Sequence, residues 1–211
     1  MGYVIATLKT DVRKLLDEQG VNDSGFTNAG GTGIADTDDS EIDALIALYA
    51  PEARNFVLSG CEASLLEKEV SRGSTTTGAT NLTGVMRLVR ATNSNWKRDV
   101  TEFIDKGSKD YTMFAETESA GTNYSPKVAY GYTGATNVSL EASPAAGTTY
   151  VYYVSATAVT NNELNVTGTL LQAAVRHYLA GLVCQSLGDD RADNFFQIAR
   201  IYMGVSDDRQ S

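Results

Sequence analysis

Apolar residues near the N-terminus recur every three or four positions, which is the spacing that gives an α-helix one apolar face. This pattern predicts a helix over residues 4–18 and, after a polar loop at 21–39, a second helix that continues through Pro51. We expect Asp38 or Ser40 to cap the second helix, because their side-chain oxygens can accept hydrogen bonds from its free backbone N–H groups.

The same spacing returns near the C-terminus. An apolar stripe runs from Leu170 to Leu187 and predicts a long helix that ends at Gly188. A further apolar stripe ends at Gly204, so another helix is expected there. The short link between the two makes them an antiparallel pair.

The middle of the chain changes to short runs rich in β-branched and aromatic residues, which favour strands. Residues 71–84 are predicted to be a polar connector, and Trp96, Val100 and Phe103 at helical spacing predict a short helix. Gly, Pro and Asn between the runs are typical of hairpin loops, so we expect an antiparallel meander. The expected strands cover residues 85–93, 111–118, 127–132, 138–142 and 149–158.

These elements together predict an α+β fold in a single domain of 211 residues. Residues 1–73 and 157–211 are expected to form a helical bundle, and residues 82–156 a β-rich antiparallel insertion in it. The segment at 61–70 fits a helical extension and a strand equally well, so both alternatives stay open.

One expected strand, TYVYYVS at residues 149–155, is apolar or aromatic on both faces. Side chains alternate along a strand, so Tyr150 and Tyr152 point to one side and Tyr153 to the other. A strand on the surface of a monomer normally shows one polar face. These tyrosines therefore either contact another subunit or pack within their own chain.

The chain is acidic, with 26 Asp and Glu against 17 Lys and Arg, a net charge of −9 and a pI near 4.6. This balance argues against binding to phosphate backbones, which depends on Lys and Arg. The first residues lack the features of a secretory signal, and no apolar run reaches the ~20 residues that span a bilayer. We therefore expect folding in a cytosol, with Cys61 and Cys184 as reduced, buried thiols.

The sequence contains no motif that indicates catalysis. His177 is the single histidine and lies beside an apolar helical stripe, so we expect it to be a packed residue rather than a catalyst. One histidine and two isolated cysteines do not make a zinc site, and the acidic run DTDDSEID lacks the spacing of a calcium loop. Neither a G-x-S-x-G elbow nor a phosphate-binding loop is present. We therefore expect a protein that is not an enzyme and uses no cofactor or metal.

The order of parts resembles that of the head–tail adaptor proteins of tailed bacteriophages, also called connector or head-completion proteins. The resemblance covers most of the chain and rests on IDALIALYAPEARNFVLSG, VMRLVRATNSNWKRDVTEFI, SPKVAYGY and LLQAAVRHYLAGLVCQSLGDDRADNFFQIARIYMG. In this family a helical bundle carries a β-rich insertion. Twelve subunits form a ring beneath the portal that continues the DNA channel towards the tail.

The resemblance implies a structural virion protein of the neck, assembled in the host cytoplasm and located at the head–tail junction. Its implied partners are its own copies in a dodecamer, the portal protein and further neck or tail proteins. DNA passes through the lumen without specific binding, and no membrane is involved. The implied subunit interface holds Tyr130, Tyr132, Tyr150, Tyr152 and Tyr153.

The C-terminal tail has no apolar periodicity, so we expect it to be mobile in the free subunit. The resemblance implies that it docks on the portal through Asp207, Asp208 and Arg209, and the other possibility is that it stays in solvent. The alternative function is a β-rich recognition module of a phage fibre or surface protein, in which exposed aromatic rings stack on glycans. Such a module binds sugars as a monomer or trimer, whereas an adaptor forms a ring with its neighbours.

Overall fold

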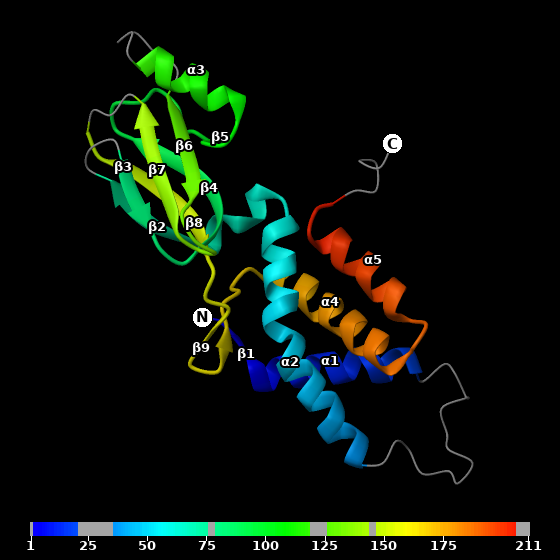
Figure 1. The fold of residues 1–211 in the computed structure, drawn as a ribbon. Coiled ribbons are helices and arrows are strands. Elements are labelled where there is room, and N and C mark those ends of the chain that lie inside the picture. The colour runs from blue at the N-terminus through cyan, green and yellow to red at the C-terminus, as the bar shows by residue number, and fades with distance from the viewer. Residues whose placement is uncertain (1, 21–35, 76–78, 119–125, 144–146, 206–211) are drawn as a thin grey trace. The chain divides into compact units, whose positions relative to one another are not determined.

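The computed structural model describes residues 2–20, 36–75, 79–118, 126–143 and 147–205 (Figure 1). The chain divides into two compact units. Met1–Glu69 and Thr157–Ser211 make up the helical unit, and Val70–Ala156 make up the β unit. Helices combine with antiparallel and mixed sheets, which confirms the expected α+β class.

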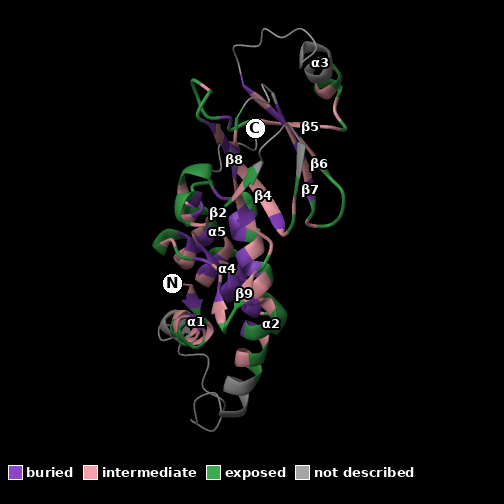
Figure 2. Ribbon diagram, turned by 90° about the vertical axis from the view of Figure 1, so that its left-hand side faces the viewer, coloured by how far each residue is buried: buried purple, intermediate pink, exposed green. Residues whose placement is uncertain are grey.

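Among the described residues, four α-helices form most of the helical unit, and α4 packs against the other three. Buried residues occupy most of the circumference of α4, as expected for a helix with neighbours on several sides (Figure 2). The elements are β1 (Tyr3–Val4), α1 (Ile5–Gly20), α2 (Asp36–Gly60), the 3₁₀ helix η1 (Ala63–Lys68), β9 (Val159–Thr160), β10 (Glu163–Leu164), α4 (Thr169–Leu187) and α5 (Ala192–Tyr202).

A small sheet within the helical unit joins the N-terminal residues to the segment that follows the β unit. β9 and β10 form a hairpin, and β1 pairs with β10 on its other side. Asn161 and Asn162 form the turn with φ values of 52° and 62°. A two-residue hairpin turn of this kind needs positive φ, which Asn tolerates better than most residues.

The residues that lead into α4 are held by a residue from a distant part of the chain. Gly168 precedes the helix and has no side chain that could cap it, and the backbone N–H groups just before the helix bind a carboxylate. Oε1 of Glu69 accepts hydrogen bonds from the backbone N–H of Thr167 at 2.7 Å, from the Thr167 hydroxyl at 2.8 Å and from the backbone N–H of Gly168. A carboxylate suits this place because a helix N-terminus carries a partial positive charge.

Arg54 of α2 is buried in the same unit, and its guanidinium group donates hydrogen bonds there. Its Nε donates to the carbonyl oxygen of Asn165 at 3.0 Å, and its Nη1 donates to Oδ1 of Asn55 at 2.9 Å. Burial lowers the pKa of Arg54 to about 10, and the negative charge of Glu69 opposes this shift. Glu69 therefore stabilises both the start of α4 and a buried cation.

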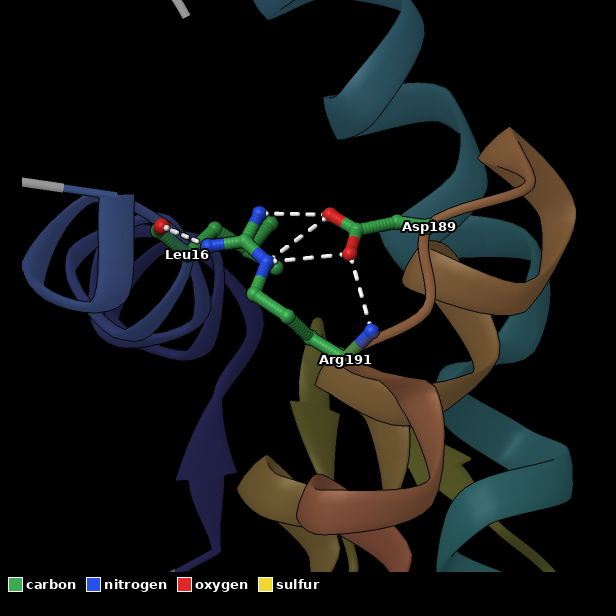
Figure 3. A network of polar contacts seen from close by, with 3 residues as sticks. All are labelled: Leu16, Asp189 and Arg191. Atoms are coloured by element: carbon green, nitrogen blue, oxygen red, sulfur yellow. Dashed lines mark hydrogen bonds and ion pairs between the residues drawn. The ribbon is translucent and has the colours of Figure 1, made fainter. Parts of the chain in front are cut away.

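The link between α4 and α5 is held by a short polar network (Figure 3). Gly188 ends α4 with φ 71°, and the backbone N–H of Asp189 donates to the carbonyl of Cys184 at 2.8 Å. Nη2 of Arg191 lies 2.6 Å from Oδ2 of Asp189, and Nη1 of Arg191 donates to the carbonyl of Leu16 at 3.0 Å. This arginine thus ties the link to α1.

The β unit contains two sheets that share one apolar core. The cluster of buried residues includes Ala91, Val128, Leu140 and Val151, which come from both sheets. The strand orders are β2–β8–β4 and β3–β7–β6–β5. The elements are β2 (Val70–Thr75), β3 (Ala79–Leu82), β4 (Val85–Asn93), β5 (Phe103–Asp105), α3 (Lys109–Glu118), β6 (Lys127–Tyr132), β7 (Val138–Ser143) and β8 (Thr149–Ser155).

The polar connector predicted at 71–84 is wrong, because β2 and β3 lie there. Both are edge strands, and they pair with β8 and β7 respectively. A Cβ at Gly73 would lie 2.6 Å from a methyl group of Leu82, so the small residue suits this place. Pairing with a strongly β-forming neighbour, rather than local propensity, makes these polar segments strands.

The helix predicted around Trp96 is also wrong. Val100 exchanges both backbone hydrogen bonds with Ala91, and β5 pairs with β6 in parallel. The strand predicted at 111–118 is wrong in the opposite sense, since these residues belong to α3. In both places tertiary partners override the local sequence pattern.

The antiparallel meander is wrong as a topology, because β8 does not join the sheet of β7 but lies between β2 and β4. The remaining strand predictions are confirmed by β4, β6, β7 and β8, although β8 ends at Ser155 and not at residue 158. β5 with β6 is the parallel pair, and the other pairs among the described strands are antiparallel.

The predicted helices of the helical unit are confirmed by α1, α2, α4 and α5. α2 continues through Pro51 as expected but begins at Asp36, so positions 38 and 40 lie inside the helix and not at its cap. The segment at 61–70, left open above, forms η1 and the first residue of β2. Residues 21–35 of the expected loop lie outside the described residues.

Candidate functional site

His177 is a packed residue of α4. Its ring centroid lies 5.3 Å from that of Tyr202 and 6.4 Å from that of Phe195. Its Nδ1 lies 2.8 Å from the carbonyl oxygen of Ala173, one turn earlier. Burial is the main cause that lowers the pKa of His177, so the ring is neutral at pH 7. This environment fits the packing role expected from the sequence.

The low pKa of His177 predicts a stability loss in mild acid. The unfolded chain takes up the imidazole proton near pH 6.5, before the folded chain does, so folding becomes less favourable as the pH falls below that value. We expect the stability of the wild type relative to His177→Gln to fall between pH 7.5 and 5.5. The slope is at most about 1.4 kcal/mol per pH unit, the value for one proton. Urea unfolding of both proteins across this range tests it, and a pH-independent difference contradicts it.

The described residues present no arrangement typical of a metal centre. Cys61 and Cys184 are buried cysteines outside any disulfide, as expected, and burial raises the pKa of Cys184 to about 11. Within the described ranges, no three His, Cys, Asp or Glu side chains are grouped so as to hold a metal ion. No described helix combines the length and apolar character needed to cross a bilayer.

Three of the five tyrosines that the sequence analysis assigned to a subunit interface make contacts within the β unit. Tyr130 and Tyr153 are half-buried and pack against the apolar core cluster. Tyr132 meets Tyr130 edge-on at 6.0 Å between ring centroids, and its hydroxyl donates to the carbonyl of Met86 at 3.4 Å. About half of Tyr132 nevertheless stays exposed.

Tyr150 and Tyr152 lie on the opposite face of β8 from Tyr153, as strand alternation predicts. The Cζ atom of Arg72 lies 4.9 Å from the centroid of the Tyr150 ring, and that of Arg90 lies 4.4 Å from the centroid of the Tyr152 ring. These are cation–π contacts. We call this surface of the β2–β8–β4 sheet the Arg–Tyr face, made of Arg72, Arg90, Tyr150 and Tyr152.

The register of the sheet explains why these four residues meet. Tyr152 of β8 is paired with Arg72 of β2 on one side and with Arg90 of β4 on the other. Directly paired residues point to the same face of a sheet, so the central tyrosine lies between two cations. Sequence reasoning found the tyrosines but missed the arginines, because β2 was not predicted and its position beside β8 is a matter of topology.

The β unit also has a hollow of about 630 Å³ beside β5. Four carboxylates line it, against two cationic side chains, and its apolar lining comes from Val100, Phe103, Ile104 and Pro126. We call it the acidic hollow. The charged residues that line it are Arg98, Asp99, Glu102, Asp105, Asp110 and Lys127.

A second aromatic surface lies on the helical unit. The ring of Phe56 in α2 stacks on Tyr178 in α4 at 4.1 Å between centroids, and Tyr178 meets Phe196 in α5 at 5.0 Å. Phe56 is exposed. A Cβ at Gly181 would lie 2.5 Å from the Phe196 ring, so the glycine lets this ring lie close to α4.

The residues assigned to portal docking, Asp207, Asp208 and Arg209, lie outside the described residues. No protein-family model matches the sequence, and no curated protein matches it. The described side chains therefore offer two exposed aromatic surfaces and one acidic hollow as candidates for function.

Proposed function

We propose that the chain is a structural virion protein: the subunit of a head–tail adaptor ring that connects the portal to the tail and continues the DNA channel. The observation that carries this proposal is the division of the chain. Both ends form one helical unit, and the middle of the chain forms a β unit inserted between α2 and α4. Head–tail adaptors, which the sequence resembles, have their parts in this order.

Exposed aromatic and arginine side chains support an assembling subunit. A ring subunit has two lateral surfaces, and both Tyr and Arg are enriched at protein interfaces. The Arg–Tyr face belongs to the β unit, and the stack of Phe56, Tyr178 and Phe196 belongs to the helical unit. Each unit therefore has its own candidate surface for contact with a neighbour.

The charge of the chain is consistent with a channel through which DNA moves. A net charge of −9 on each copy disfavours lasting contact with phosphates. Carboxylates along a lumen would repel the duplex and let it slide.

Glycan recognition, the alternative function, has weaker support. Sugars stack on the open faces of aromatic rings, but a guanidinium group already lies over one face of both Tyr150 and Tyr152. About a third of Tyr150 is accessible, so this ring offers a sugar only a small platform.

Electron microscopy of the chain mixed with purified portal rings tests the proposed function. We expect a ring of twelve copies bound to one end of the portal, seen directly as twelvefold density. Native mass spectrometry of the same mixture should give the matching stoichiometry. A chain that stays monomeric beside the portal, or that binds immobilised glycans instead, contradicts the proposal.

A further inference from the structure

We infer that the Arg–Tyr face of one copy binds the acidic hollow of a second copy, so that the β units associate head to tail. The inference deepens the proposed ring and rests on it, because it names the contact between neighbouring subunits. Both surfaces belong to the β unit of the chain.

The Arg–Tyr face is cationic in a chain that is strongly anionic overall. Arg87 is paired with Val154 and therefore points to the same side of the sheet as Tyr152, which adds a third guanidinium to the face. Nη1 of Arg90 lies 3.5 Å from Oδ2 of Asp99, and these side chains are 42% and 48% exposed. An ion pair this exposed contributes little to stability, so Arg90 can exchange Asp99 for a carboxylate of a partner.

The tyrosines hold two of these arginines in place. A guanidinium over an aromatic ring keeps its N–H donors, and its planar fork matches the two oxygens of a carboxylate. Because the side chain is already ordered, less rotamer entropy is lost when it binds. The face is therefore prepared for an acidic ligand.

Another copy of this chain is an acidic ligand of this kind. Each copy carries nine surplus negative charges, so two copies repel each other except where a cationic surface meets an acidic one. The acidic hollow offers the exposed carboxylates of Glu102, Asp105 and Asp110 around a concave, partly apolar floor. Its volume of about 630 Å³ can take side chains as large as Tyr150 and Arg72.

The contact has a direction, which decides what it can build. The face and the hollow touch within one copy at the Arg90–Asp99 ion pair but are otherwise made of different residues, so a copy that binds one neighbour through its face can bind the next through its hollow. Repetition of such a heterologous contact gives a closed ring or an open filament. A nucleic-acid phosphate could also pair with the arginines, but the net charge of −9 disfavours that ligand, and the experiment below includes it.

Charge exchange between the two surfaces tests the inference on the full-length chain. The face variant carries Arg72→Glu with Arg90→Glu, and the hollow variant carries Glu102→Lys with Asp110→Lys. All four side chains are half-buried or exposed, so we expect both variants to keep the thermal midpoint of the wild type. A control variant, Lys14→Glu with Lys68→Glu, changes the net charge as much as the face variant does, at exposed positions of the helical unit.

Sedimentation velocity and native mass spectrometry at low salt measure self-association. We expect each variant alone to associate at least about tenfold more weakly than the wild type, whereas the control variant keeps its association. An equal mixture of the face and hollow variants should recover association, because each reversed surface then meets its reversed partner. High salt should weaken the wild-type contact.

Four outcomes would overturn the inference. One is a face variant that associates like the wild type, and another is a mixture that fails to recover association. The third is a wild type that binds a fluorescent DNA duplex through Arg72 and Arg90, while replacing these two arginines leaves its self-association unchanged. The fourth is a wild type that stays monomeric at about 1 mM. Failure of the inference does not decide the proposed function, because a twelvefold ring on the portal is detected separately by microscopy and can form through contacts of the helical unit.

Discussion

Replacing Phe195 by Ala is expected to lower the free energy of unfolding by about 3–5 kcal/mol, the usual cost of removing a buried aromatic ring. Phe195 is fully buried in α5 and lies against His177 of α4. Truncation removes the apolar contacts of the ring and leaves a cavity between two helices that cannot close fully. Urea unfolding followed by circular dichroism at 222 nm, where helices dominate, measures the loss.

Ile201→Ala is the matched control in the same helix. Ile201 is 73% exposed, so its truncation should change stability by no more than about 0.5 kcal/mol. Equal losses for the two variants would mean that α5 does not pack on α4 as described.

Replacing Glu69 by Gln is expected to cost about 2 kcal/mol, because hydrogen bonds to a charged group are stronger than those to a neutral amide. The carboxylate accepts three bonds at the start of α4, and its charge favours the ionised form of buried Arg54. Both contributions weaken when the charge is removed. Urea unfolding followed by circular dichroism at 222 nm measures this loss, because the signal at that wavelength comes mainly from the helices.

Glu67→Gln provides the control for Glu69, since Glu67 is an exposed acid two residues earlier in η1. It should leave the free energy of unfolding within about 0.5 kcal/mol of the wild type. A Glu69→Gln variant as stable as this control would show that the negative charge of Glu69 adds nothing to the stability of the helical unit.

The sequence predicted the helices well because their signals are long and redundant. In α4 the apolar stripe, the terminal Gly188 and the short link to α5 all indicate the same element. The strand β8 was equally clear, since six of its seven residues are β-branched or aromatic. Where several local signals agree, the tertiary structure has little to override.

The errors in the β unit arise where partners decide the structure. Tyr111 suggested a strand by its residue type, but it lies in α3, and its hydroxyl donates to Oε2 of Glu141 on β7 at 2.9 Å. Asp105 prepares the turn before that helix by accepting the backbone N–H of Gly107 at 2.7 Å. Val100 followed helical spacing, yet its backbone pairs with Ala91. Residue spacing carries no information about such distant partners.

The tyrosines of the Arg–Tyr face could be predicted from the sequence, but its arginines could not, because they come from neighbouring strands. Alternation along β8 separated Tyr150 and Tyr152 from Tyr153, and the structure places them on opposite faces. Arg72 and Arg90 come from strands on either side of β8, and one of these strands was taken for a connector. A surface built from three strands becomes visible only when their order in the sheet is known.

The division of the helical unit between the two ends of the chain has a consequence for synthesis. The β unit is complete once Ala156 has left the ribosome, whereas α1 and α2 still lack α4, the helix on which both pack. Domains usually fold as units during translation, so the β unit should fold first. Until α4 emerges, the apolar faces of α1 and α2 stay uncovered, and the nascent chain presents them to chaperones rather than to its own core.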